Sequence, residues 1–527
     1  MKKRLASAVL STCLLVAALP VTAAAEEPQN AQQVRVGSVI LTDGMGWNND
    51  GSTTAHGSKD NNAYFDDGVL YLNDAEIQAT YEVGISVEEG SLTIDLSGEN
   101  AMYPQIDAED QYYNVGIQAG ELYDHKTGQL SIQGDGALYM EGARTGILAC
   151  QGRPLSIRDA ALYMDTSEIT VRTYNRCDIS GTAELWMICR SGSYGMKVSD
   201  LTISDDVLLY CDAANGYQCD GIFVGWTDET PEPHELSITG GTIYVKATSH
   251  ALVCSEGNID ITNAALELYS GEMSCIGASG YFDPDTISTK GGTVSIDDSL
   301  KVKAGDDPFT AQEADDVETN FENYKYVCIA PSFEWENPFE DVTEEDWFYD
   351  AVSYVNQYGL MNGVADTQFA PKGKVTRAQA VQMVYAMSAN YPFQYGLEAR
   401  EYVFFDDVDL DAWYAEAACW GGGTGVVSGV GNNRFAPNVN VPREQFATIL
   451  YSFAQKTGYD VSARASLDSF HDAAKVSGWA KNAMQWAVAE GVMSGTNKGN
   501  LNPKGTLTRA EAAAMLRSFV RATVVKA

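Results

Sequence analysis

Apolar residues in the last third of the chain recur with the period of an α-helix, and they do so three times. In each stretch they fall at positions i, i+3, i+4 and i+7, which is one face of an amphipathic helix. The three sets are Ala380, Met383, Val384 and Met387, then Phe446, Ile449, Leu450 and Phe453, then Ala512, Met515, Leu516 and Phe519. Three stripes in the same phase predict three helices packed around a common centre.

A shorter helical pattern precedes each of these helices, so the repeating unit is predicted to be helix, loop, helix. In "YDAVSYVNQYG" the residues Val352, Val355 and Tyr358 share one face before a glycine that ends the helix. Other residues recur about 66 positions apart. They are Arg377, Arg443 and Arg509; Trp347, Trp413 and Trp479; Gly363, Gly429 and Gly495; and, with one extra residue before the third tryptophan, Asp341, Asp407 and Asp472.

The repeated arginine stands in the first turn of each second helix, where a positive charge is unfavourable. In "TRAE", Thr508 can cap the helix and Glu511 can complete a capping box, and Thr376 with Gln379 repeats this arrangement. A cation at this end costs roughly 0.3 to 1 kcal/mol against the helix dipole. Two interpretations stay open. Either an anion in front of the helix binds the arginine and the free N–H groups, or the arginine pairs with an acid of the neighbouring unit, such as the repeated aspartate.

The second copy departs from the pattern of the other two. Pro442 replaces the capping threonine, and three successive glycines in "CWGGGTG" occupy positions where helix formers are expected. Each glycine weakens a helix by about 1 kcal/mol relative to alanine. We therefore expect the first helix of this copy to be loosened.

The combined motifs "FEDV…W…GLMNG…FAPKGKVTRAQ" and their two successors resemble S-layer homology (SLH) domains over about residues 339 to 525. The resemblance implies a three-unit, all-α, spindle-like module that binds secondary cell-wall polysaccharide non-covalently, at a pyruvylated amino sugar. It also implies that Arg377, Arg443 and Arg509 bind the pyruvate carboxylate. The repeated aspartates, tryptophans and glycine loops would frame the same binding grooves.

The region before these repeats has short β-rich runs separated by turns. Six segments share one template, as in "QLSIQGDGALYMEG" and "PLSIRDAALYMDTS". Their anchor residues are Ile132, Ile157, Ile179, Ile203, Ile238 and Ile261. Four of the five spacings between them are 22 to 25 residues, and the fifth holds an insertion. Repeats of this length predict the rungs of a right-handed parallel β-helix. In rhythm these segments resemble the β-helical, carbohydrate-binding-like domains of exported bacterial proteins.

Aromatic residues in this region alternate with the inward positions and should therefore point outward. They are Tyr71, Tyr139, Tyr163, Trp186 and Tyr244. Because rungs lie ~4.8 Å apart, their rings could form a ladder on which a glycan stacks. The alternative, which we favour, is that the rings stabilise neighbouring strands. In "VLLYCDA" the alternation is ambiguous, which interrupts the ladder.

An enzyme is the second hypothesis for this region, because parallel β-helices also carry polysaccharide lyases and glycoside hydrolases. The candidate acids are the adjacent pairs Asp66 and Asp67, Asp205 and Asp206, and Asp297 and Asp298. Aspartate is common in turns, where it is simply solvated. The sequence predicts no catalytic residue, no metal ligand and no cofactor, although Ca²⁺ is the ion that such acidic turns would take.

Charge and targeting signals restrict the partners and the location. Lys2, Lys3 and Arg4 precede an apolar run that ends in small residues, which predicts a secretory signal. Removal of residues 1 to 25 leaves 31 positive and 72 negative side chains, a net charge of −41. Such a chain repels nucleic acid and anionic membranes. No later stretch reaches the ~18 apolar residues of a membrane span. The nine remaining cysteines show no zinc-type spacing, and we expect small buried thiols rather than disulfides.

The predicted organisation is a signal peptide (1–25), a β-helix (36–330), a linker (331–338) and three SLH units (339–392, 405–458 and 466–525). The expected location is the cell wall or S-layer of a Gram-positive-type bacterium. The β-helix would bind an extracellular glycan or serve as a coat component; the alternative is a wall-anchored polysaccharide lyase or glycoside hydrolase.

Overall fold

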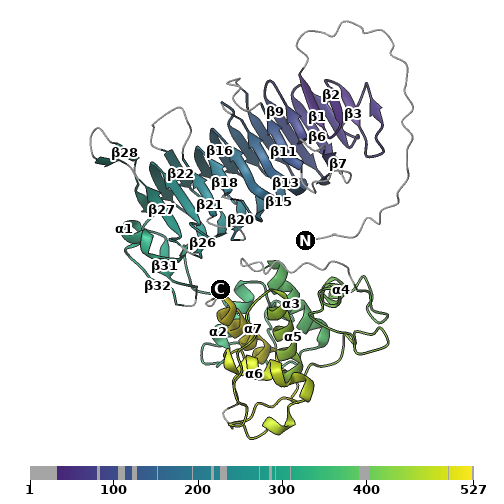
Figure 1. The fold of residues 1–527 in the computed structure, drawn as a ribbon, viewed down its shortest axis with the longest axis vertical. Coiled ribbons are helices and arrows are strands. Elements are labelled where there is room, and N and C mark those ends of the chain that lie inside the picture. The colour runs from purple at the N-terminus through teal and green to yellow at the C-terminus, as the bar shows by residue number, and fades with distance from the viewer. Residues whose placement is uncertain are drawn as a thin grey trace.

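A computed structural model describes residues 32–524 except 80–82, 105–112, 121–127, 151, 193, 215–218, 226–233, 272, 280, 284–287, 291, 309, 391–402 and 497. The predicted signal peptide lies outside the described residues. The described chain forms an all-β region, here called the β region, followed by a helical module (Figure 1).

The β region consists of three stacks in which most strands pair in parallel with the equivalent strand of the next repeat. The first stack contains β7 (Glu76–Ala79), β10 (Glu99–Pro104), β13 (Ala137–Ala149), β15 (Ala161–Thr173), β17 (Glu184–Cys189), β20 (Leu208–Ala213), β23 (Thr242–Ala247) and β26 (Ala265–Ser270). The second contains β8 (Val83–Val87), β11 (Tyr113–Ala119), the later halves of β13 and β15, β18 (Tyr194–Val198), β21 (Asp220–Val224), β24 (Leu252–Ser255) and β27 (Ile276–Ser279). The third contains β6 (Val69–Asn73), β9 (Leu92–Ser97), β12 (Leu130–Gly134), β14 (Leu155–Arg158), β16 (Arg176–Ser180), β19 (Asp200–Ile203), β22 (His234–Ile238), β25 (Gly257–Ile261) and β30 (Val294–Ile296).

Shorter elements lie at the two ends of these stacks. Antiparallel strands precede the first rungs: β1 (Gln33–Val36), β2 (Val39–Thr42), β3 (Met45–Trp47), β4 (Thr53–Thr54) and β5 (Ala63–Asp66). The later elements are β28 (Tyr281–Asp283), β29 (Ser288–Lys290), β31 (Lys301–Gly305), β32 (Gln312–Glu313), α1 (Val317–Asn320), η1 (Phe321–Asn323) and β33 (Tyr326–Ala330). The parallel-rich stacks are consistent with the predicted β-helix.

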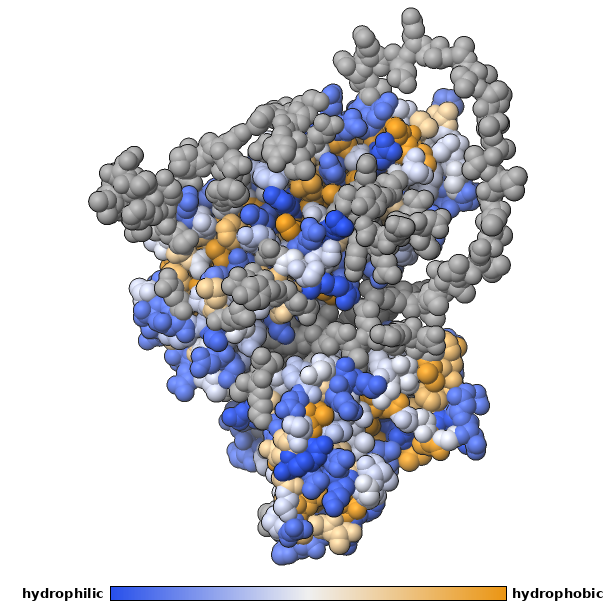
Figure 2. All heavy atoms as spheres, viewed as in Figure 1, coloured by the Kyte–Doolittle hydropathy of each residue, from blue (hydrophilic) through white to orange (hydrophobic). Residues whose placement is uncertain are grey.

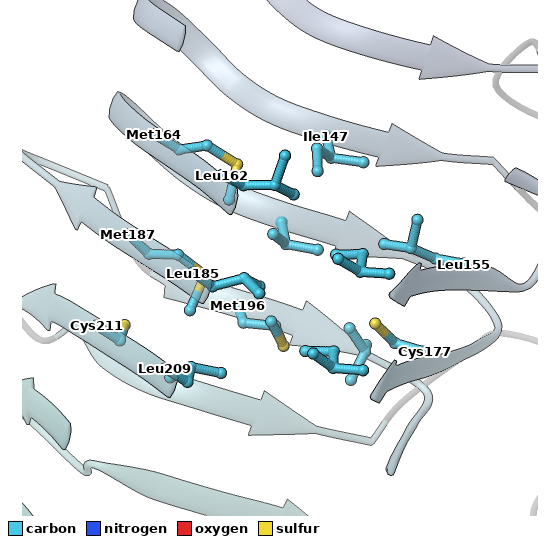
Figure 3. Packing of buried hydrophobic residues seen from close by; sticks show 14 of the residues in the cluster. Ile147, Leu155, Leu162, Met164, Cys177, Leu185, Met187, Met196, Leu209 and Cys211 are labelled. Atoms are coloured by element: carbon cyan, nitrogen blue, oxygen red, sulfur yellow. The ribbon is translucent and has the colours of Figure 1, made fainter. Parts of the chain in front are cut away.

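The predicted isoleucine anchors form one continuous row in the core. In the third stack Ile132 pairs with Ile157, and the row continues through each later anchor to Ile261. Every anchor is fully buried. Figure 3 shows how leucines and sulfur-bearing side chains of successive rungs, such as Leu162 and Leu185 or Met164 and Met187, lie above one another. Each rung therefore buries an apolar face that it could not bury alone.

Glycines in the second stack make room for large core side chains of the first. A Cβ on Gly84 would collide with the sulfur of Met102, and a Cβ on Gly116 would collide with the sulfur of Met140. Farther along, Gly195 faces a cysteine sulfur in the same way. Two stacks can thus approach each other closely while a long side chain fills the space between them.

The nine cysteines that follow the predicted signal peptide are all described and form no disulfide bonds, and all except Cys328 are buried. Burial raises the pKa of the Cys177 thiol, and it raises the pKa of Cys254 to about 12. They therefore act as small apolar side chains rather than as disulfides or reactive thiolates, as the sequence predicted.

The helical module has three units, each with two main helices. They are α2 (Tyr349–Gln357) and α3 (Arg377–Asn390), then α4 (Ala415–Thr424) and α5 (Arg443–Lys456), then α6 (Lys481–Ala489) and α7 (Arg509–Val524), with η2 (Ala473–Lys475) and η3 (Gly478–Ala480) before α6. The predicted apolar stripes of α3, α5 and α7 are buried, and Phe453 meets Phe519 at the centre with ring centroids 5.9 Å apart. The helices pair cyclically between units: α2 packs on α7, α4 on α3, and α6 on α5.

Two details of the module concern its glycines and its loops. The glycines in "CWGGGTG" lie within α4, which runs through them, and the loosening of this helix stays a prediction. They permit close packing: a Cβ on Gly421 would meet Val381, and one on Gly422 would meet Phe405. The module is also not purely helical, since isolated β-bridges join its loops, as between Lys374 and Thr508.

The β region and the helical module meet at a buried carboxyl group. Glu267 of β26 is 8% exposed. It accepts hydrogen bonds from the hydroxyl of Tyr326 in β33 (2.9 Å) and of Tyr358 at the end of α2 (3.3 Å). The neighbouring Tyr269 packs against the core of the module. One carboxyl group therefore links both halves of the chain.

Candidate functional site

The starts of α3, α5 and α7 form a ring in which each unit contacts the loop of the next. The backbone N–H groups of Arg377 and Ala378 donate to carbonyls of Val439 and Pro437 in the second unit. The other two helix starts repeat this pattern, α5 toward the third unit and α7 toward the first. The N–H groups that we expected to face an anion are therefore occupied by backbone carbonyls.

Each repeated arginine extends into the following unit and holds two of its carbonyls. Arg377 donates from Nε to Phe435 (2.8 Å) and from Nη2 to Ser428 (3.0 Å). Arg443 holds Leu501 and Ser494 in the same way, and Arg509 holds Phe369 and Asn362. We call these sites the Arg377, Arg443 and Arg509 clamps. All three side chains are at least nine-tenths buried, so each clamp joins two units with charge-assisted hydrogen bonds.

The repeated aspartates hold the other side of the same peptide segments. Asp341 accepts from the N–H groups of Phe369 and Ala370, both at 2.8 Å. Asp407 and Asp472 do the same in their own units. Although desolvation raises the pKa of Asp407, the two N–H donors bring it below the ordinary value. The aspartates thus position the clamped segment within each unit.

The third guanidinium nitrogen distinguishes the clamps from one another. Nη1 of Arg443 donates to Glu511 at 2.8 Å, which is an ion pair with the neighbouring unit. Among the described residues, Nη1 of Arg377 and of Arg509 has no hydrogen-bond acceptor. These two arginines instead lie over the rings of Phe435 and Phe369, 4.9 Å and 4.6 Å from the centroids. Burial lowers the pKa of both, and Asp407 and Asp341 oppose that effect.

The ion-pair interpretation of the arginine is therefore right only in part, and binding of an anion stays a prediction, although the backbone N–H groups that it invoked donate to carbonyls. The side chain does reach the neighbouring unit, but it binds carbonyl oxygens rather than the repeated aspartate. Within the part of the chain that the structure describes, an acid partner occurs at Arg443 alone among the three, and that acid is Glu511 of the capping box. The capping boxes themselves form as expected, with Thr508 N–H 2.8 Å from Glu511 and Thr376 N–H 3.0 Å from Gln379. Pro442 makes no side-chain cap.

The repeated glycines and tryptophans have different environments. A Cβ on Gly363 would meet the ring of Phe339, and Gly429 and Gly495 face the equivalent phenylalanines. These glycines are therefore required for packing beneath the loops. The three tryptophans, in contrast, are exposed by 61 to 69%. These side chains are Trp347 in the first unit, Trp413 in the second and Trp479 in the third. Large exposed rings in each unit are suited to contact with a sugar ring.

The predicted aromatic ladder exists in the first stack with different members. Tyr139, Tyr163, Trp186 and Tyr244 occupy one column, and Tyr210, which the sequence left ambiguous, lies between the last two. Tyr71 is not part of it, because it belongs to the third stack and pairs with Tyr64.

The rings of this column largely face one another. Tyr139 and Tyr163 stack with centroids 4.7 Å apart and planes 9° apart, and Trp186 lies 4.9 Å from Tyr210. Both Tyr163 and Trp186 donate to Glu184. The flat faces of these rings are thus used between rungs, and the polar atoms of Tyr163 and Trp186 are used by Glu184. This arrangement favours the role of stabilising neighbouring strands.

The paired acids of the β region lie on its exposed turns. Asp67 and Asp205 adopt positive φ angles of 46° and 65°, a turn conformation that aspartate tolerates. Within the described ranges no cluster of three or more His, Cys, Asp or Glu side chains is arranged to hold a metal ion. None of the helices in those ranges is long and apolar enough to cross a membrane.

Comparison with known proteins identifies the repeating units. Residues 338–381, 404–447 and 469–513 match the model of the S-layer homology domain. The helical module therefore consists of three S-layer homology domains, which indicates a cell-surface, cell-wall-associated protein.

Proteins with quite different names share this part of the chain. The surface-layer 125 kDa protein of Lysinibacillus sphaericus is 33% identical over 163 residues, which is 30% of this chain and 13% of that protein. The S-layer protein of Bacillus thuringiensis subsp. finitimus is 30% identical over 175 residues, 33% of this chain and 20% of that protein. Amylopullulanase of Thermoanaerobacterium thermosulfurigenes is 30% identical over 186 residues, 35% of this chain and 10% of that protein. The chain thus spans a fifth or less of these relatives.

Proposed function

We propose that this protein is exported and held non-covalently to secondary cell-wall polysaccharide by its three S-layer homology domains, with the β region displayed at the surface. The observation that carries the proposal is the nature of the shared segment. S-layer proteins and an amylopullulanase match the chain over about a third of its length. A segment that is shared by proteins of such different names is best explained as a module for attachment to the cell wall.

The ligand we propose is a pyruvylated amino sugar of that polysaccharide. Nη1 of Arg377 and of Arg509 can donate to a carboxylate without disturbing the carbonyls that the same arginines hold. The exposed tryptophans supply apolar surface for the sugar ring. The net charge of −38, or −41 without residues 1–25, makes non-specific adhesion to an anionic wall unfavourable, so retention requires specific sites.

The test of attachment is co-sedimentation of the full chain with purified cell walls of a bacterium that carries such polysaccharide. Walls should retain the protein before, but not after, mild acid treatment that removes the pyruvyl groups. Equal retention on both preparations would exclude the pyruvyl group as the ligand. Arg→Ala variants are poorly suited to this experiment, because each clamp also joins two units.

For the β region we propose display as a surface or coat component with contact to extracellular glycan. The support is the aromatic column, which includes Tyr139, Tyr163, Trp186 and Tyr244. In it, Tyr163 and Trp186 donate hydrogen bonds to the carboxylate of Glu184. The carboxylate of Glu184 in this column disfavours acidic polysaccharides, so a neutral glycan is the expected class. A glycan array with the wild type and with Trp186→Ala tests this role; an array without signal for the wild type would leave display as the function.

A further inference from the structure

The aromatic column of the first stack ends in a carboxyl group. Glu267 of β26 continues the column, because it pairs with Tyr244 of β23 on one side and with Cys328 of β33 on the other. Leu266 and Leu268 lie in the core, so Glu267 between them points to the outer face. It is nevertheless only 8% exposed. Another part of the chain therefore covers this outward-facing carboxyl group.

The helical module provides that cover. The hydroxyl of Tyr358, directly after α2, donates to Oε1 of Glu267 at 3.3 Å, and the hydroxyl of Tyr326 in β33 donates to the same oxygen at 2.9 Å. Tyr269, on the same face of β26, packs against the core of the module. One oxygen atom thus accepts a hydrogen bond from each of the two regions. We call this arrangement the Glu267 contact.

The titratable groups that surround Glu267 on the neighbouring elements are uncharged. Burial raises the pKa of each of them, and they are Tyr244, Tyr326, Cys328 and Tyr358. Tyr354 of α2 lies behind Tyr358, with ring centroids 4.7 Å apart. The carboxyl group is therefore enclosed by phenol rings and a thiol.

Two lysines lie on the strands nearby. Lys246 of β23 pairs with Tyr269 rather than with Glu267. The ammonium group of Lys303 in β31 lies 4.4 Å from the centroid of the Phe333 ring. Among the described residues neither lysine contributes to the pKa shift of Glu267, which results from burial and is opposed by the two hydroxyl groups. An ionised Glu267 thus has no compensating cation within this part of the chain.

Ionisation of Glu267 leaves a buried charge with only two neutral donors, which is strongly unfavourable. The carboxyl group cannot move to water by itself, because β26 is paired on both sides and the flanking leucines lie in the core. The module is less constrained, since residues 331–338, which join the two regions and are all described, form no helix or strand. Separation of Tyr358 from the carboxylate is therefore the smallest movement that admits water.

We propose that the Glu267 contact is a pH-sensitive junction: protonated Glu267 holds the β region against the helical module, and ionisation of this carboxyl group releases the two regions from each other. The β region is then held in a fixed orientation in acidic surroundings and moves relative to the module in alkaline ones. This inference does not depend on the ligand of the module or on that of the β region.

Proton linkage gives the size of the effect. Burial raises the pKa of Glu267 from 4.5 to about 7 in the closed junction, whereas a carboxyl group that faces water keeps its ordinary value. The closed form binds the proton more tightly, so acid favours the closed form, and this advantage is lost as the pH rises through about 7. Between pH 5.5 and pH 8.5 the ratio of open to closed molecules should increase about 30-fold.

Cys328 is a reporter within the chain, because it faces Glu267 and is the one cysteine of the nine that is not buried. Its rate of alkylation by N-ethylmaleimide is measured in the full chain by mass spectrometry at pH 5.5 and pH 8.5. Each rate is divided by that of Glu267→Gln at the same pH, which removes the pH dependence of the reagent. The amide of this variant does not ionise, and its oxygen can still accept from both hydroxyl groups.

The relative rate of the wild type should increase at least fivefold, and up to about 30-fold, between the two pH values. The negative charge of Glu267 by itself slows formation of the thiolate, so an increase reports opening of the junction. Small-angle X-ray scattering should show a larger radius of gyration at pH 8.5 for the wild type but not for Glu267→Gln. Glu235→Gln, at an exposed position of β22, should behave as the wild type. A constant or lower relative rate, or an unchanged radius of gyration of the wild type, would overturn the inference.

Discussion

The carboxyl group at the junction of the two regions gives a prediction with a definite sign. Burial raises the pKa of Glu267 from 4.5 to about 7, while hydrogen bonds from Tyr326 and Tyr358 oppose the shift. Both tyrosines have pKa values well above 10, and burial raises the pKa of the adjacent Cys328 to about 12. The groups around Glu267 therefore stay neutral while Glu267 itself titrates. Lys303, which faces Cys328, is the nearby cation on the neighbouring strand.

The magnitude follows from proton linkage. Because the folded chain binds the proton more tightly than the unfolded chain, this group's contribution to stability is fully present below pH 4.5 and is lost as the pH rises through about 7. At about 1.4 kcal/mol per pKa unit, the loss is roughly 3 kcal/mol in the free energy of unfolding. Glu267→Gln cannot ionise, and its amide oxygen can still accept from both hydroxyl groups.

The assay is urea unfolding of the wild type and Glu267→Gln at pH 5 and pH 8. The two proteins should be about equally stable at pH 5, and the variant should be more stable at pH 8 by up to about 3 kcal/mol. Glu235→Gln, at an exposed position of β22, is the matched control and should show no such difference. If the free energies of unfolding of the wild type and of Glu267→Gln differ by the same amount at pH 5 and at pH 8, the argument is refuted.

Three further substitutions test the packing and the module. Gly363→Ala should lower the free energy of unfolding by about 1 to 3 kcal/mol because the new Cβ meets the Phe339 ring, whereas Gly478→Ala, with open space around it, should change little in the same urea titration. Asp472→Asn should cost about 1.5 to 3 kcal/mol, since it weakens two charge-assisted hydrogen bonds; an unchanged melting temperature would contradict this. Ile179→Ala, in the fully buried row of anchors, should cost about 2 to 5 kcal/mol, measured by thermal unfolding followed by circular dichroism.

Local patterns in the sequence predicted most of the fold. The isoleucine anchors specified which side of each rung faces the core, and the helical stripes specified the faces of α3, α5 and α7. Both signals depend on residues close in sequence. Aromatic alternation also placed four residues of one column correctly, but it could not show that Tyr71 belongs to a different stack, because that depends on how the first rungs pair.

The site required information that local patterns lack. The carbonyls held by Arg377 lie 51 and 58 residues away, and those held by Arg509 lie 140 and 147 residues away. Because every residue has a backbone carbonyl, a carbonyl partner cannot be recognised from the type of side chain. The same is true of Glu267, whose partner Tyr358 belongs to the other region.

The central claim is that the module attaches the protein to the wall through carboxylate-bearing sugars. The most direct measurement is the binding of the full chain to immobilised, purified wall polysaccharide in parallel with the same polymer after selective removal of its pyruvyl groups. The account predicts saturable binding to the first and a loss of at least tenfold in affinity for the second. Equal affinity for both polymers would contradict it.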